Sequence, residues 1–273
     1  ARQGARRGAE GLLLTDWGDH GHYQPLGQSW YGYAYGATQA WSGGETTDEA
    51  FDARFGTLWF GDHGDKVVEA IRALGRLNTL EGMPRPNNSN SIVMVLDEPL
   101  AGDLWRTVPD ETLAEVVAVA RAAEGVFRAA QRESRDPLTL EEMALTCRWL
   151  EYGAIKVRVT RALRNALASP LNLQRMARAG MHTLRKLARE LEPLQADFVR
   201  LWRLRARDSE IRIHLEALES LKERFGLAEQ WLARIASGEL DSLEVAAYRK
   251  ATPRYKILGQ AFWREMRAIT GQP

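Results

Sequence analysis

Five residues near the start of the chain carry side chains suited to binding a small polar molecule. Asp16, Trp17, Asp19 and His20 combine carboxylates, an indole and an imidazole in a short stretch, and Trp41 follows further along. A sugar offers C–H faces that stack on indole rings and hydroxyl groups that hydrogen-bond to carboxylates. We therefore predict that these residues bind a carbohydrate, with Trp41 as a wall opposite Trp17.

Metal binding is the main alternative for the same stretch. Asp16, Asp19, His20 and His22 offer oxygen and nitrogen ligands close together. However, their spacing differs from the i, i+4 histidines of an H-E-x-x-H helix, and no third cluster of ligands follows. The chain also lacks the G-x-S-x-G motif of a serine nucleophile. We predict neither a metal nor another cofactor.

The candidate site follows a short apolar run. Leu12–Thr15 is predicted to be a strand buried on both faces, and Tyr33–Gln39 is predicted to be a second strand. Because a buried parallel strand cannot stand alone, we expect the chain to be the C-terminal part of a longer protein. A helix should follow, capped within residues 46–48 and ended by Gly61. Its predicted buried stripe is Phe51, Phe55, Leu58 and Trp59.

The sequence after residue 62 has the pattern of an all-helical domain. Ala, Leu, Arg and Glu recur at helical spacing over residues 63–273, with a turn-rich linker at 82–91 and a short strand or extended segment at Ile92–Leu96. The predicted helices, some started by Pro137, Pro170 or Pro193, span 66–80, 110–133, 139–168, 171–191, 194–225, 228–235, 243–250 and 255–269. The predicted fold class is therefore mainly α with a small α/β part.

The overall composition is that of a globular protein. The chain has 273 residues, of which 45% are hydrophobic and 27% charged, and its formal net charge is +1. No apolar window is long enough for a membrane span or a signal peptide, so we predict no membrane partner and leave the compartment open. Basic residues, mostly arginine but including Lys156, are frequent in residues 148–212, where their helical spacing indicates solvated helix faces. Cys147, the only cysteine, is predicted to be buried and inert.

Two segments resemble a known enzyme family. TDWGDHGHYQPLGQSWYGYAYGATQAW and DEAFDARFGTLWFGD are similar to the last two strand and helix units of the catalytic barrel in glycoside hydrolase family 20, the β-N-acetylhexosaminidases. The bacterial members with a helical C-terminal extension are the most similar, and LWRLRARDS, residues 201–209, resembles a helix near the end of such enzymes. The resemblance implies that residues 1–62 are the C-terminal portion of a (β/α)8 barrel, with the upstream part of that barrel as their partner.

The resemblance also implies roles for the candidate residues. In the family, an aromatic residue and an aspartate two positions apart hold the terminal sugar after the seventh strand, which matches Trp17 and Asp19, with Asp16 as an adjacent alternative. A tryptophan after the eighth strand stacks beneath the sugar ring, which matches Trp41. The family's acid two residues later falls on Gly43, so the sequence departs from the family pattern there.

The family's chemistry needs an acid pair that this sequence does not assign. The acetamido carbonyl of the substrate attacks the anomeric carbon, while an Asp-Glu pair on the fourth strand orients it and protonates the leaving group, unlike the usual two-carboxylate scheme. That strand would precede Ala1, and Asp97-Glu98, which imitates the pair, precedes Pro99 in an expected loop or helix start.

We therefore expect the chain to supply sugar-binding residues of a hydrolase acting on β-linked N-acetylhexosamine, and to be inactive alone. The alternative is a non-catalytic helical module whose arginine-rich surface binds nucleic acid or an acidic partner. We regard nucleic acid as the less favoured of these partners, since the arginines have the spacing of solvated helix faces.

Overall fold

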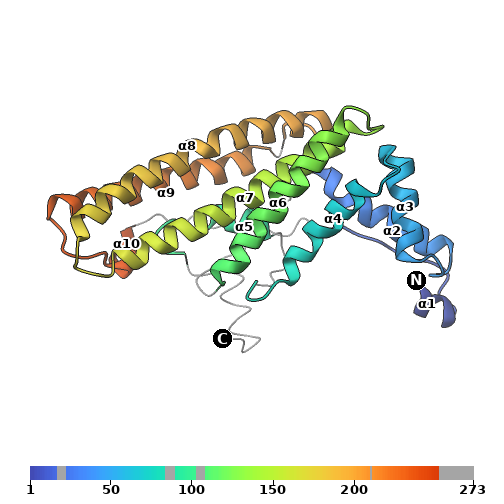
Figure 1. Cartoon of the computed structure of the whole chain (residues 1–273), viewed down its shortest axis with the longest axis horizontal. Coiled ribbons are helices and arrows are strands. Elements are labelled where there is room, and N and C mark those ends of the chain that lie inside the picture. Colours follow the sequence, from blue (N-terminus) through green and yellow to red (C-terminus); the bar gives the residue numbers. More distant parts are fainter. Residues whose placement is uncertain (17–22, 84–89, 103–107, 210, 252–273) are drawn as a thin grey trace. The chain divides into compact units, whose positions relative to one another are not determined.

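The computed structural model describes residues 1–16, 23–83, 90–102, 108–209 and 211–251 (Figure 1). All regular elements within these ranges are helices, which confirms the predicted mainly α class. The chain divides into two compact units. The first comprises Ala1–Gly18, Gln24–Leu77 and Ala118–Arg148, and the second comprises Asp19–Tyr23, Asn78–Val117 and Trp149–Pro273.

The helices of the N-terminal part are short. They are α1 (Arg2–Arg6), the 3-10 turn η1 (Leu26–Ser29), α2 (Trp30–Trp41), α3 (Asp48–Phe55), the π-helical turn η2 (Gly56–Phe60), α4 (Lys66–Arg76) and the 3-10 turn η3 (Leu77–Thr79). The Thr47 side chain caps α3 by accepting a hydrogen bond from the Ala50 N–H at 3.2 Å, and Gly61 ends η2 with a φ of 75°. Both signals were predicted, and both act locally along the chain.

Aromatic rings join α2 to α3 in the core of the first unit. The Tyr31 ring meets Phe51 and Phe55 edge-on, with centroids 5.3 and 5.4 Å apart. Its hydroxyl donates a hydrogen bond to Asp52 at 2.6 Å, and Arg72 of α4 pairs with the same carboxylate. Burial and the bond to Asp52 raise the pKa of the Tyr31 phenol. One tyrosine thus connects three helices.

Three segments that the sequence analysis predicted as extended differ in the structure. Tyr33–Gln39 lies inside α2, because Tyr31 and Tyr35 are four residues apart and present their rings to the same neighbour, Phe51. Ile92–Leu96 lies in the helix α5, since a short apolar run does not distinguish a strand from a buried helix. Leu12–Thr15 has neither strand nor helix geometry. Neither of the two strands predicted within residues 1–62 is therefore present, and Leu12–Thr15, predicted to be buried on both faces, is exposed.

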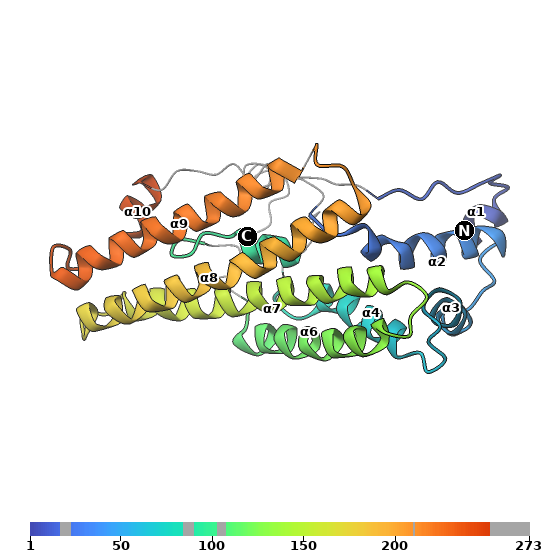
Figure 2. The same cartoon turned by 90° about the horizontal axis from the view of Figure 1, so that it is seen from above.

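The C-terminal part of the chain consists mostly of long helices. They are α5 (Asn90–Leu96), α6 (Asp110–Gln131), α7 (Pro137–Ala166), α8 (Leu173–Arg205), α9 (Ile211–Ser237) and α10 (Val245–Ala251). Within the second unit, α8 and α9 lie side by side along most of their length (Figures 1 and 2). The buried residues of their shared seam include Leu184, Leu187, Leu191, Leu218, Leu221 and Leu232.

The prediction of a helix break at Pro193 is wrong. Helix α8 continues through this residue, and the chain turns only between Arg205 and Ile211. A proline inside a helix removes one backbone hydrogen bond and costs about 3 kcal/mol. Pro193 itself is exposed, while Leu191 and Leu194 on either side of it are buried, so the apolar seam continues across the proline. The predicted helix at 228–235 is likewise part of α9.

The other predicted helices agree better with the structure. Those at 66–80, 110–133, 139–168 and 243–250 overlap α4, α6, α7 and α10. Pro137 is the first residue of α7, as its missing N–H predicts. The predicted helix at 255–269 lies outside the described residues.

The seam between α8 and α9 generates a stability prediction. Leu184→Ala removes a fully buried side chain and should lower the free energy of unfolding by about 2–5 kcal/mol, because it leaves a cavity. Leu204→Ala on the same helix is the matched control, since Leu204 is 57% exposed, and it should change this free energy by less than about 0.5 kcal/mol. Urea unfolding followed by circular dichroism measures both; equal effects would show that the seam does not stabilise the second unit.

Candidate functional site

The structure describes two of the five residues predicted to bind a carbohydrate. Trp17, Asp19 and His20 lie outside the described residues. Asp16 is described and exposed, and its carboxylate accepts a hydrogen bond from the hydroxyl of Ser29, in the turn that leads into α2. This hydrogen bond connects the end of the segment 11–16 to the turn η1, directly before α2.

Trp41 is the last residue of α2 rather than the end of a strand. Its side chain is 95% exposed, so it contributes nothing to the core of the first unit. The chain then turns through Gly43 and Gly44, with φ values of 63° and 89°, in the left-handed region that favours glycine. This geometry gives a local reason why position 43 carries no acid. The guanidinium of Arg2 donates to the Gly44 carbonyl oxygen, at 3.0 Å from Nε and 2.6 Å from Nη2.

The apolar run before Asp16 is exposed. Leu12, Leu13 and Leu14 are 50%, 86% and 43% exposed, respectively. Leu14 lies against α2 at Gly36, where an added Cβ would be only 2.5 Å from the Leu14 Cδ2 atom. The segment therefore touches its following helix through one leucine, while most of the apolar surface of Leu13 faces away from the described part of the first unit.

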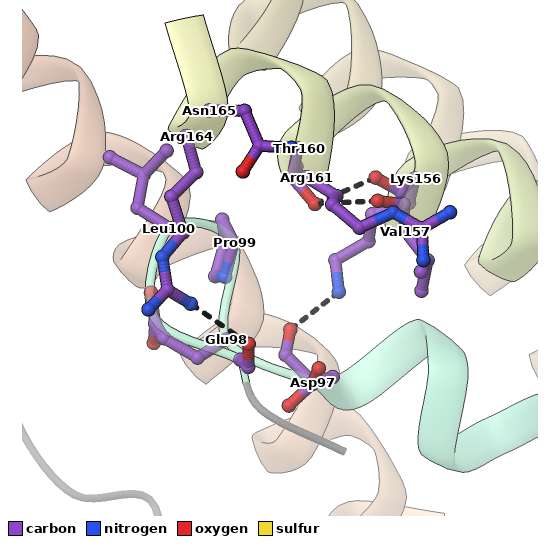
Figure 3. A pocket seen from close by; sticks show the side chains of 11 residues that line it. Asp97, Glu98, Pro99, Leu100, Lys156, Val157, Thr160, Arg161, Arg164 and Asn165 are labelled. Carbon is purple, nitrogen blue, oxygen red and sulfur yellow. Dashed lines mark hydrogen bonds between the residues drawn. The ribbon is translucent and has the colours of Figure 1, made fainter. Parts of the chain in front are cut away.

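A second polar site lies in the second unit, and the sequence analysis did not predict it. Lys156 of α7 is 1% exposed, and its ammonium donates hydrogen bonds to the carbonyl oxygens of Met94 at 3.2 Å and Asp97 at 2.5 Å. These carbonyls belong to the C-terminal end of α5 and the turn after it, where backbone acceptors lack helical partners and carry partial negative charge. Figure 3 shows the lysine reaching from α7 to this turn.

Burial shifts the ionisation of both charged residues in this site. Burial raises the pKa of Asp97 to about 6, and the nearby Lys156 ammonium opposes the rise. Burial lowers the pKa of Lys156 to about 8, opposed in turn by the charge of Asp97. In both residues desolvation outweighs the attraction between them. Perturbed groups of this kind cluster at functional sites, which is why we regard the pair as a candidate site.

Glu98 connects the turn to two more helices. Its carboxylate accepts a hydrogen bond from the hydroxyl of Tyr248 in α10 at 2.5 Å and lies 3.8 Å from the guanidinium of Arg224 in α9. Tyr248 and Arg224 are both buried. The prediction that Asp97-Glu98 lies in a loop or helix start is confirmed, since the pair directly follows the end of α5.

A cavity of about 70 Å³ adjoins these residues, between the turn at 97–102 and the C-terminal half of α7. Arg164 crosses it to donate a hydrogen bond to the Gly102 carbonyl oxygen at 3.2 Å (Figure 3). Arg161 donates to the Val108 carbonyl oxygen and pairs with Asp110. The cavity is thus lined by side chains of α7, three of them basic, and by the turn at 97–102, which includes the acids Asp97 and Glu98.

One sequence signal points to this site in retrospect. Lys156 stands four residues after Tyr152 and four before Thr160, and all three are buried on one face of α7. A lysine at a buried helical position needs several acceptors to compensate for its lost hydration. The signal was missed because the lysine was counted among the basic residues of a solvated face.

The remaining candidates have structural roles in the described residues. Cys147 is buried, as predicted, and burial raises the pKa of its thiol. His214 is packed among the rings of Tyr23, Phe198 and Trp202. Within the described ranges no three His, Cys, Asp or Glu side chains form a group that could hold a metal ion, and no helix is long and apolar enough to cross a membrane.

The raised pKa of Asp97 predicts how stability depends on pH. A carboxyl group whose pKa is higher in the folded state stabilises the fold below its unfolded value of 3.8, and this contribution is lost as the pH rises to about 6. Asp97→Asn cannot ionise, so its stability relative to the wild type should increase by up to about 3 kcal/mol between pH 4 and pH 7, at about 1.4 kcal/mol per pKa unit. Urea unfolding at both pH values measures the difference. A constant difference would contradict the raised pKa.

Comparisons of the chain with protein-family models, with curated proteins and with solved structures found no match.

Proposed function

We propose that this chain supplies part of the carbohydrate-binding site of a family 20-like glycoside hydrolase that acts on β-linked N-acetylhexosamine. The observation that carries the proposal is the exposed apolar segment Leu12–Leu14, which packs on α2 at one point and leads directly to Asp16. An apolar strand that ends in polar residues and is followed by a helix is the repeating unit of a (β/α)8 barrel, whose sites lie at the C-terminal ends of the strands.

The exposure of the three leucines supports pairing with an upstream sheet. Fully burying a leucine side chain stabilises a protein by about 1.5–3 kcal/mol, so Leu13 gains most from a neighbouring layer. The proposal covers one unit, residues 11–41, because Tyr33–Gln39 is helical, and it requires Leu12–Thr15 to become a strand by pairing with the upstream sheet. The upstream strands would bury Leu13 and place the end of the segment beside the rest of the binding site.

Two described residues suit the proposed ligand. The exposed indole of Trp41 offers a face for the C–H surface of a sugar ring, and the Asp16 carboxylate offers acceptors for hydroxyl groups. Trp17 and Asp19 keep the roles that the resemblance implies, and His20 stays a predicted sugar-binding residue. In this proposal the catalytic Asp-Glu pair lies upstream. Asp97-Glu98 does not suit that role, because Asp97 is buried and Glu98 bonds to Tyr248 and pairs with Arg224.

Ion pairs on α8, on α9 and at the residues after α8 weigh against the alternative of a nucleic-acid or acidic partner. Arg185, Arg203 and Arg212 pair with Glu229, Asp208 and Glu216, respectively, which reduces the positive charge available to a phosphate backbone. Salt separates the two functions. Binding through phosphates weakens steeply as salt rises, whereas binding of a neutral sugar hardly responds.

Trp41→Ala tests the sugar-binding role in a longer protein that carries the proposed upstream strands. Loss of the apolar contact with one ring face, about 1.5–3 kcal/mol of transition-state stabilisation, should lower kcat/KM for an aryl β-N-acetylglucosaminide about 10- to 150-fold. Leu171→Ala, which removes another strongly exposed apolar side chain, should leave kcat/KM unchanged. The chain described here should not hydrolyse the substrate. Hydrolysis by this chain, or an unchanged kcat/KM in the Trp41 variant, would refute the proposal.

Leu13→Lys tests the proposed contact with an upstream sheet. In this chain alone the substitution should change the free energy of unfolding by less than about 0.5 kcal/mol, because Leu13 is 86% exposed. In the longer protein it should lower the free energy of unfolding by more than about 1.5 kcal/mol, because the contribution of a buried leucine is lost and a charge is buried in its place. Leu58→Lys, at another exposed leucine of the first unit, is the control. Equal effects of Leu13→Lys in the two proteins would contradict the proposed pairing.

A further inference from the structure

The cavity beside the turn at 97–102 concentrates hydrogen-bond donors. The ammonium of Lys156 has three N–H groups, of which two are used by the Met94 and Asp97 carbonyls. Arg164 brings a guanidinium to the same cavity. The side-chain amide of Asn165 also lines it and makes no hydrogen bond to any other residue that the structure describes.

The charges of the lining favour a negative occupant. Three lining residues are basic, Lys156, Arg161 and Arg164, and two are acidic, Asp97 and Glu98. Arg161 pairs with Asp110 and Glu98 with Arg224, so with these two partners included the sum is 3 − 2 − 1 + 1 = +1 when all are ionised. Glu98 is further neutralised from behind by Arg224 at 3.8 Å and by the Tyr248 hydroxyl. A divalent cation would be repelled by the same basic groups, whereas an anion would be attracted to them.

The size of the cavity restricts the occupant to a small group. At about 10–15 Å³ for each water position, 70 Å³ has room for a few waters or for one compact polyatomic ion. A tetrahedral oxyanion presents acceptors in several directions, which suits a guanidinium, an ammonium and an amide that line one cavity from the same helix.

We propose that this cavity binds a phosphate group, either inorganic phosphate or the terminal phosphate of a small monoester. Arg164, Lys156 and Asn165 donate hydrogen bonds to its oxygens, and the turn at 97–102 closes the opposite side. The site lies within the second unit and uses none of the residues assigned to carbohydrate binding, so either proposal can fail without the other.

Calorimetric titration of this chain with inorganic phosphate at fixed ionic strength tests the proposal. We expect saturable binding with one site, weakened at least tenfold by Arg164→Gln, which removes the charge and the fork of donors. Arg158→Gln is the matched control, because Arg158 is an exposed arginine on the same helix that does not line the cavity. No saturation up to about 10 mM, or equal loss in the two variants, would overturn the proposal.

A second variant guards against a folding defect in the first. Asn165→Asp places a negative charge in the cavity at an exposed position, and it breaks no hydrogen bond within the described residues. Circular dichroism should show wild-type helicity, while phosphate affinity falls at least tenfold; unchanged affinity would overturn the proposal. Glycerol phosphate identifies the source. Tighter binding than inorganic phosphate supports a monoester, and equal or weaker binding supports the free ion.

Discussion

The buried ammonium of Lys156 is the constraint on which the interior of the second unit depends. Removing an ammonium from water costs several kcal/mol unless acceptors replace its hydration. The acceptors here are two carbonyl oxygens, one in the last turn of α5 and one in the residue that follows the helix, and they are available because the helix stops there. The end of α5, the turn after it and the position of α7 are therefore determined together. Glu98 extends the same network to α9 and α10 through Arg224 and Tyr248.

Signals that act within a few residues could be read from the sequence. Thr47 caps α3 and Gly61 ends the following π-helical turn because each effect depends only on a side chain and its adjacent backbone. The strand predicted at Tyr33–Gln39 failed because aromatic residues favour strands in general, while here Tyr31 and Tyr35 are four residues apart and face Phe51 of α3. The composition of this segment is compatible with both a strand and a helix, and packing against α3 favours the helix.

The same distinction explains Pro193 and Lys156. A proline predicts a helix break from local geometry, but burial of Leu191 and Leu194 on α8 outweighs the lost hydrogen bond. A lysine predicts a solvated position from its charge, but the end of a helix distant in sequence supplies its acceptors. Neither effect can be predicted without knowing which helices contact each other.

The carbohydrate-binding prediction depends on residues close together in the sequence, and of these the structure describes Asp16 and Trp41.

The two proposed sites follow from opposite departures from ordinary burial. Exposed apolar side chains such as Leu13 and Trp41 leave surface whose removal from water would stabilise a complex, which is why we propose binding partners for them. Buried charges such as Lys156 and Asp97 carry a desolvation penalty that a well-packed apolar core would avoid, so they indicate a site within it. The exposed apolar side chains would be stabilised by contact with further apolar surface, and the buried basic groups by an anion. The two proposed sites should therefore bind different ligands. A sugar would respond weakly to ionic strength and a phosphate strongly, which makes salt the variable that separates them.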